Sequence, residues 1–129
     1  MSTAANRRGG RDRRRSSGLL RVPFVRSCSL AVEGHARSAL IVNINVLGAY
    51  LACDEIPDVG TSVAIVFQVP GNEIETESRG QVAWMNPVQQ HKVHSLPPGF
   101  GMRFVELPDA ARARIQVIVG EYASQQRQA

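Results

Sequence analysis

Two asparagines and a glycine interrupt an otherwise apolar stretch at residues 40–51. Asn43, Asn45 and Gly48 stand in the spacing Asn-x-Asn-x-x-Gly. This spacing predicts a turn between two strands, because Asn bonds nearby backbone and Gly48 allows a backbone conformation closed to other residues. The same spacing leaves side-chain amides pointing outward from the edge of a rigid sheet. We therefore predict that this stretch reads a polar ligand.

The arginines upstream of this stretch supply a second kind of chemistry. Residues 1–21 contain seven arginines and one acidic residue, a net charge of +6, whereas the remaining 108 residues carry eight basic and ten acidic groups, a net charge of −2. A basic arm on a near-neutral body indicates an anionic partner. Guanidinium groups contact phosphate in a bidentate manner and stack on planar bases. The arm is thus expected to form the opposite half of an anion-binding clamp.

Catalytic and metal chemistry is poorly supported by the remaining residues. His91 and His94 have the spacing of a metal-binding pair, but no cysteine or acidic residue lies nearby in their loop to complete a site. Glu73, Glu75 and Glu77 alternate along a strand, so they share a solvent face rather than forming an acid–base pair. We expect no catalytic residue, no metal and no cofactor.

The compartment is inferred from cysteine usage and hydropathy. Cys28 and Cys53 are the only cysteines, and we expect both to be reduced and buried. No stretch approaches the roughly 20 apolar residues that a membrane span needs. Residues 1–18 lack the hydrophobic segment of a secretory signal. These features predict a cytoplasmic protein without a membrane span.

A change in composition divides the chain into an arm, a body and a tail. Residues 1–18 are rich in Arg, Gly and Ser and predict a flexible arm, residues 19–123 predict one domain, and residues 124–129 predict a polar tail. Within the domain, alternating apolar residues bounded by turn residues predict six strands. They cover residues 22–32, 38–44, 49–53, 61–69, 74–84 and 100–105.

A helix is expected after the last strand. Pro108 and Asp109 suit a first helical turn, and apolar residues at helical spacing should pack on the sheet. Gly120 lies inside this helix, where its missing side chain would allow close packing. Trp84 and Phe104 are expected in the core. Together these elements predict a mainly β fold, a small six-stranded antiparallel barrel with a C-terminal helix.

The order of these short motifs resembles the PilZ domain, a bacterial receptor module for cyclic di-GMP. PilZ domains carry an Asp/Asn-x-Ser-x-x-Gly motif between their second and third strands, and Asn43, Asn45 and Gly48 fall on its positions. The other matching pieces are Val-Gly-Thr at 59–61, Pro-Gly at 70–71, Gly-x-Val-x-Trp at 80–84 and Gly-Phe-Gly-Met-Arg-Phe at 99–104. The resemblance runs from about Arg14 to Val119 and implies a PilZ-like split barrel.

The arginine motif of the family is displaced in this chain. PilZ domains have Arg-x-x-x-Arg just before the first strand, and Arg21 occupies the second arginine's place, but Ser17 stands four residues earlier. Either a short insertion loops out, so that Arg14, Arg15 and Arg21 form the clamp, or Arg11 and Arg15 serve at the correct spacing farther upstream. Asn45 also departs from the family pattern, because it replaces the usual Ser.

The resemblance implies a non-enzymatic receptor for cyclic di-GMP. The arginines would clamp phosphate and guanine, Asn43 and Asn45 would bond guanine edges or ribose, and Gly48 would allow the ligand to approach the backbone. The arm would become ordered on binding and create a surface for an unidentified protein effector, since no effector domain is attached.

Two other functions remain open at this point. A degenerate PilZ module that binds no nucleotide would act as a protein–protein adaptor, and the departures at Ser17 and Asn45 favour it. Nonspecific nucleic-acid binding through the arm requires only its charge, but the body is slightly acidic and has few aromatic residues on which bases can stack.

Overall fold

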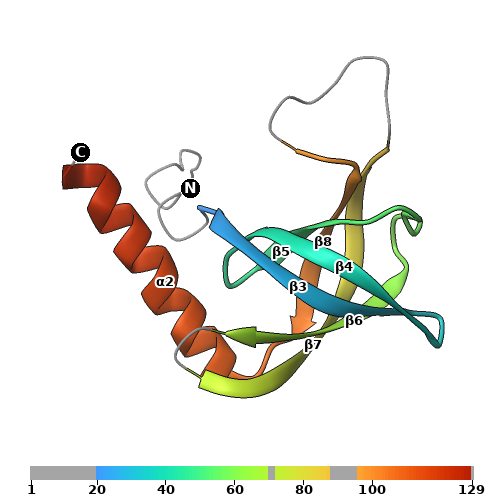
Figure 1. The fold of residues 1–129 in the computed structure, drawn as a ribbon, viewed down its shortest axis with the longest axis horizontal. Helices are drawn as coiled ribbons and strands as arrows, with labels where there is room; N and C mark the ends of the chain where they lie inside the picture. Colours follow the sequence, from blue (N-terminus) through green and yellow to red (C-terminus); the bar gives the residue numbers. More distant parts are fainter. Residues whose placement is uncertain (1–19, 70–71, 88–95, 129) are drawn as a thin grey trace, which may run out of the picture.

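The computed structural model of the chain describes residues 20–69, 72–87 and 96–128 (Figure 1). It contains six strands followed by one helix among these residues. The strands are β3 (Val22–Val32), β4 (His35–Ile44), β5 (Gly48–Ala52), β6 (Ser62–Val69), β7 (Asn72–Asn86) and β8 (Gly99–Glu106), and the helix is α2 (Asp109–Gln128).

The six strands close into an antiparallel barrel in the order β3-β4-β5-β8-β7-β6. The predicted mainly β fold, with a six-stranded barrel and a C-terminal helix, is confirmed. Side-chain alternation explains the arrangement, since β6 turns Val63, Ile65, Phe67 and Val69 inward and its other residues outward. Closure leaves few unpaired strand edges, which suits a small all-β domain.

The hairpin between β3 and β4 is tighter than the sequence predicted. The expected turn covered residues 33–37, but only Glu33 and Gly34 lie outside the strands. Both have positive φ, 52° and 83°, as a two-residue turn with the twist of the flanking strands requires. Residues 35–37 therefore pair with β3, and His35 lies opposite Val32.

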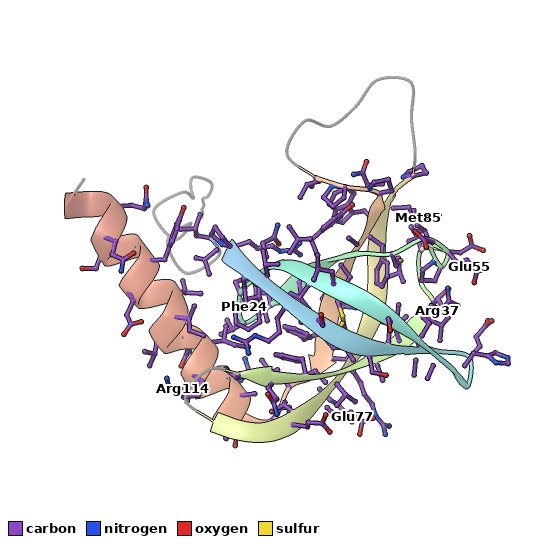
Figure 2. All side chains as sticks on the ribbon, in the orientation of Figure 1. Phe24, Arg37, Glu55, Glu77, Met85 and Arg114 are labelled. Atoms are coloured by element: carbon purple, nitrogen blue, oxygen red, sulfur yellow. The ribbon has the colours of Figure 1, made fainter. Side chains whose placement is uncertain are left out.

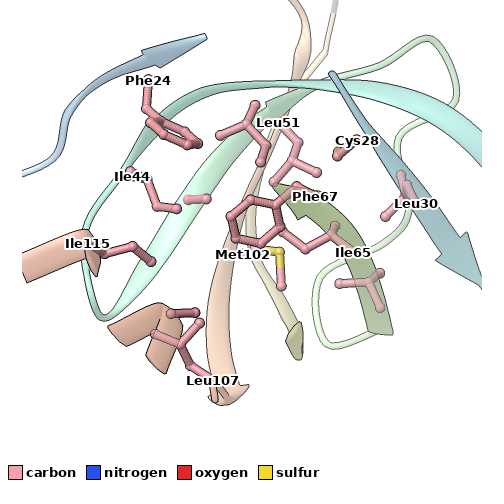
Figure 3. Packing of buried hydrophobic residues seen from close by; sticks show 14 of the residues in the cluster. Phe24, Cys28, Leu30, Ile44, Leu51, Ile65, Phe67, Met102, Leu107 and Ile115 are labelled. Carbon is pink, nitrogen blue, oxygen red and sulfur yellow. The ribbon is translucent and has the colours of Figure 1, made fainter. Parts of the chain in front are cut away.

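The core fills the barrel and extends to one face of α2. Ala111, Ile115 and Val119 follow an i, i+4, i+8 pattern and are buried, and α2 lies against β3 and β6. Figure 3 shows Ile115 directed toward the same cluster as Phe24 and Ile44 of the barrel. The predicted packing of the helix on the sheet is thus confirmed.

Both cysteines are free, and they differ in burial. Cys28 is buried in the core, where desolvation raises the pKa of its thiol to about 11. Cys53 is only half-buried at the edge of the core. The expected burial therefore holds in full for Cys28 and in part for Cys53.

A bulge in β7 turns Trp84 out of the core. Val82 pairs with Met102 and faces inward, whereas Trp84 pairs with Gly101, so the register shifts between the two. The extra residue reverses the inward–outward alternation, and Trp84 is 39% exposed. The prediction that Trp84 is a core residue is wrong for this reason. Phe104 is partly buried and packs against the core, as expected.

The helix begins as predicted but continues farther. Asp109 lies in its first turn after Pro108, whose carbonyl accepts a hydrogen bond from the Arg112 backbone N–H. Residues 124–128, expected to form a polar tail, make up its last turns. The described residues show no close packing at Gly120, because none of their heavy atoms outside the adjoining helix backbone lies within 4 Å of where its Cβ would be.

Replacing Gly120 with alanine should therefore stabilise the protein. Alanine restricts the unfolded chain and favours the helix by up to about 1 kcal/mol relative to glycine. Urea denaturation monitored by circular dichroism should show a higher free energy of unfolding for Gly120→Ala with an unchanged denaturant slope. An equal or lower free energy of unfolding would contradict the exposed placement of Gly120.

Candidate functional site

Strand register brings together residues that are far apart in the sequence. Val22 pairs with Ile44 and Ile44 with Ala49, so the residues next to these pairs become neighbours across the barrel surface. We call the resulting line of residues the first row. In order from β3 to β7 it contains Arg21, Asn45, Gly48, Arg103 and Gln81.

A second row runs beside the first on the same outer face. It contains Pro23, Asn43, Tyr50, Gly101 and Trp84, each paired with the next across the barrel. The residues that alternate with these positions, such as Ile44, Ala49 and Met102, are buried in the core. The two rows therefore form one continuous patch on the outside of the barrel, which we call the site face.

Asn45 holds the turn between β4 and β5. Its Oδ1 accepts hydrogen bonds from the backbone N–H groups of Leu47 at 2.8 Å and Gly48 at 3.0 Å. The Asn45 backbone N–H also donates to the Gly48 carbonyl at 2.9 Å. This is the local side-chain-to-backbone bonding that favours Asn in turns. The predicted turn is confirmed, and the side-chain Oδ1 of Asn45 is used in hydrogen bonds within the turn.

Gly48 is required for close approach rather than for an unusual backbone angle. A Cβ at this position would lie 2.1 Å from the Met102 carbonyl oxygen of β8. Its φ is not positive, since among the described glycines only Gly34 and Gly60 have positive φ. The expectation of a conformation closed to other residues is therefore wrong. The Leu47 carbonyl next to it accepts the Phe104 backbone N–H at 2.8 Å, which ties the turn to β8.

Asn43 presents an unsatisfied acceptor in the second row. Its Oδ1 is buried and has no hydrogen-bond partner among the described residues. Asn43 lies opposite Pro23, which has no backbone N–H to offer. A buried acceptor without a partner costs about 1–3 kcal/mol, so a ligand N–H or O–H that reached it would gain a hydrogen bond.

Arg21 places a cation over the turn. Its Nη2 lies 3.2 Å from the position that a Gly48 Cβ would take, and the side chain is half-buried. Burial lowers the pKa of the Arg21 guanidinium, because desolvation disfavours the charged form. Arginine nevertheless stays protonated, and Arg21 makes no ion pair within the described part of the chain. A partly desolvated cation without a carboxylate partner is suited to bind an anion.

Trp84 adds a planar apolar surface that the sequence did not predict. Its indole lies across Gly101, where a Cβ would be 2.0 Å from the Trp84 Nε1, and its ring centroid is 5.3 Å from that of Tyr50. Tyr50 is fully buried and fixed, since its hydroxyl donates to the Pro97 carbonyl at 2.6 Å and accepts from Asn86 Nδ2 at 3.1 Å. A supported, half-exposed indole can stack on a base. The β7 bulge that exposes it depends on pairing with β8, which leaves no local signal in the sequence.

The structure brings together four of the predicted ligand-binding residues. Arg21, Asn43, Asn45 and Gly48 all lie on the site face. The other predicted residues, Arg11, Arg14 and Arg15, lie outside the described residues, as do His91 and His94. Within the described ranges, no three His, Cys, Asp or Glu side chains are grouped so as to hold a metal ion. The helix found there is not apolar enough to cross a membrane.

Comparison with known protein families gives a match over most of the chain. Residues 11–121 match the family model described as PilZ domain, and the match covers most of the chain. It includes the site face, the arginines from Arg11 onward and most of α2. Comparison with curated proteins gives no match.

Placing a methyl group at position 48 should damage both the turn and its contact with β8. Because the Cβ would overlap a backbone oxygen, Gly48→Ala should lower the free energy of unfolding by about 1–3 kcal/mol. Gly120→Ala is the matched control in the same urea titration, since it adds the same methyl group in open space and should have the opposite sign. A Gly48→Ala variant as stable as the parent would contradict the close approach.

Proposed function

Because the chain belongs to the PilZ domain family of cyclic di-GMP receptor modules, we propose that it binds cyclic di-GMP on the site face and passes the signal to a protein partner. The observation that carries this proposal is the pairing of two uncompensated groups. Arg21 lacks an anion and Asn43 Oδ1 lacks a donor among the described residues. One ligand that carries both phosphates and N–H donors satisfies both.

The ligand offers a matching group for each feature of the site face. Arg21 can bind a phosphate, or the O6 and N7 atoms of guanine with a bidentate fork. Asn43 Oδ1 can accept from a guanine N–H or a ribose hydroxyl. Trp84 can stack on a guanine ring. Asn45 acts by holding the turn, so that Gly48 keeps its place against β8 beneath the Arg21 guanidinium.

The arm supplies the second half of the site in this proposal. The described chain starts at Leu20, directly before Arg21, so residues 1–19 are attached to the first row. Arg14 and Arg15, or Arg11 and Arg15, would close over the bound ligand. Ordering of the arm reduces the affinity but creates a new surface, and that surface is what a protein effector would recognise.

The alternative is a degenerate module that binds no nucleotide and works as an adaptor. One observation favours it: the Asn45 Oδ1, which replaces the hydroxyl usual in the family, is already bonded to two backbone N–H groups of the turn. An adaptor predicts that cyclic di-GMP leaves the protein unchanged, whereas the receptor predicts saturable binding.

Arg21→Ala should weaken cyclic di-GMP binding by at least about tenfold, equivalent to about 1.4 kcal/mol, because a charge-assisted contact is lost. Isothermal titration calorimetry at one stated salt concentration measures the change. Arg79→Ala is the control, since Arg79 is exposed, forms an ion pair with Glu77 and is not one of the residues of the site face. If the parent protein gave no heat and no chemical-shift change near Gly48, the receptor would be excluded and the adaptor favoured. If Arg21→Ala and Arg79→Ala bound cyclic di-GMP with equal affinity, Arg21 would not be part of the binding site.

Single substitutions in the arm should distinguish its two possible registers. If a short insertion loops out, Arg14→Gln should weaken binding by about tenfold and Arg11→Gln by less than about threefold. If the upstream spacing is used, the two effects should be reversed. In either case, Arg15→Gln should weaken the binding of cyclic di-GMP. Arg7→Gln is the control for the loss of one charge. Equal, small losses for all four variants would indicate nonspecific electrostatic attraction and contradict the clamp.

A further inference from the structure

We propose that Arg103 forms a second anion contact of the site, binding a phosphate of the ligand on the β8 side of Gly48. This inference rests on the proposed function and adds to it a residue on the rigid barrel. Arg103 lies in the first row directly opposite Gly48. Because Gly48 has no side chain, nothing at that position separates the Arg103 side chain from the backbone of the turn.

Arg103 and Arg21 flank the turn from opposite sides. Arg21 reaches Gly48 from the β3 side, with its Nη2 3.2 Å from the missing Cβ, and Arg103 stands on the neighbouring strand on the other side. Neighbouring strands are about 5 Å apart, so the two cations and Gly48 fall within the span of one dinucleotide. An anion over Gly48 would be attracted from both sides.

The side chain of Arg103 is oriented without being neutralised. Its Nη2 donates to Gln81 Oε1 on β7 at 3.2 Å. Guanidinium has five N–H donors, so this bond leaves the others available for bidentate contact with a phosphate. The hydrogen bond to Gln81 fixes the direction of the Arg103 side chain. Because Gln81 carries no charge, it leaves the positive charge of Arg103 uncompensated.

Two other arginines of the barrel, Arg37 and Arg79, provide the contrast. Arg37 lies 3.1 Å from a carboxylate oxygen of Glu55, and Arg79 lies 3.4 Å from one of Glu77. Figure 2 shows Arg37 and Glu55 together at the end of the barrel away from α2. Arg103 has no such carboxylate partner among the described residues. Its charge is therefore available to an external anion, while those of Arg37 and Arg79 are partly compensated.

The position of Arg103 on a strand gives the contact a rigid support. β8 is bonded to β5 and β7 on its two sides, and the Phe104 N–H bonds the Leu47 carbonyl of the turn. A contact from a rigid element needs little ordering on binding, in contrast to one from the arm. Arg103 is also two residues from Gly101, over which Trp84 lies, so it would bind a phosphate beside a stacked base.

Calorimetric titration of the full chain with cyclic di-GMP tests this assignment. Arg103→Gln should weaken binding by about tenfold, and Gln81→Leu, which keeps the charge but frees the side chain, by about threefold. Arg79→Gln removes an exposed arginine outside the site face and should leave the affinity unchanged. Thermal unfolding of each variant checks that the fold is intact. The loss caused by Arg103→Gln should shrink between about 0.05 M and about 0.5 M salt, because ions screen a contact between charges.

The outcomes separate this inference from the proposed function. If the parent chain and Arg79→Gln bind, Arg21→Ala binds more weakly, and Arg103→Gln binds like Arg79→Gln, the receptor stands and the Arg103 contact is overturned. A loss at Arg103 that is the same at all salt concentrations would overturn the phosphate assignment. If the parent chain itself did not bind, the proposed function would fail and this inference with it.

Discussion

The contact between the bare Cα of Gly48 and the backbone of β8 is the constraint on which the site depends. A Cβ there would lie 2.1 Å from the Met102 carbonyl oxygen, so only glycine lets the β4–β5 turn approach β8 this closely. That approach permits the Phe104 N–H to bond the Leu47 carbonyl and places Arg103 beside the turn. In the proposed receptor, the same missing side chain would also leave room for a ligand group beside the turn.

The turn itself is held by an internal hydrogen-bond network. The Asn45 Oδ1 accepts hydrogen bonds from two backbone N–H groups of the turn. The turn is therefore held by hydrogen bonds of the barrel itself. In the proposed receptor, the entropy lost on binding then falls mainly on the arm. Under that proposal, the barrel and the basic arm would work together as a switch.

The sequence predicted the barrel because local signals agreed with one another. Alternating apolar residues identify β6, and turn residues at Gly34, Gly48 and Gly60 mark the breaks between strands. The predicted strand bounds differ from the observed ones by a few residues, because alternation does not show where strand pairing ends. Arg21, Asn43 and Gly48, which the structure brings together on the site face, were also singled out by type and spacing. Trp84 and Arg103 were not, since their places depend on a bulge and on pairing with β8 and β5. The need for glycine at position 48 was predicted for the wrong reason, because close approach is a tertiary property.

Two local energetic penalties on the site face distinguish the receptor from the adaptor. Arg21 is partly desolvated without a carboxylate partner, and Asn43 buries an acceptor without a donor among the described residues. Each feature lowers the stability of the unliganded barrel, the second by about 1–3 kcal/mol. An adaptor that never met an anion would gain stability from a neutral residue at position 21 and an apolar one at position 43. A ligand with both phosphates and N–H donors relieves the two penalties at once, so their coexistence on one face favours the receptor.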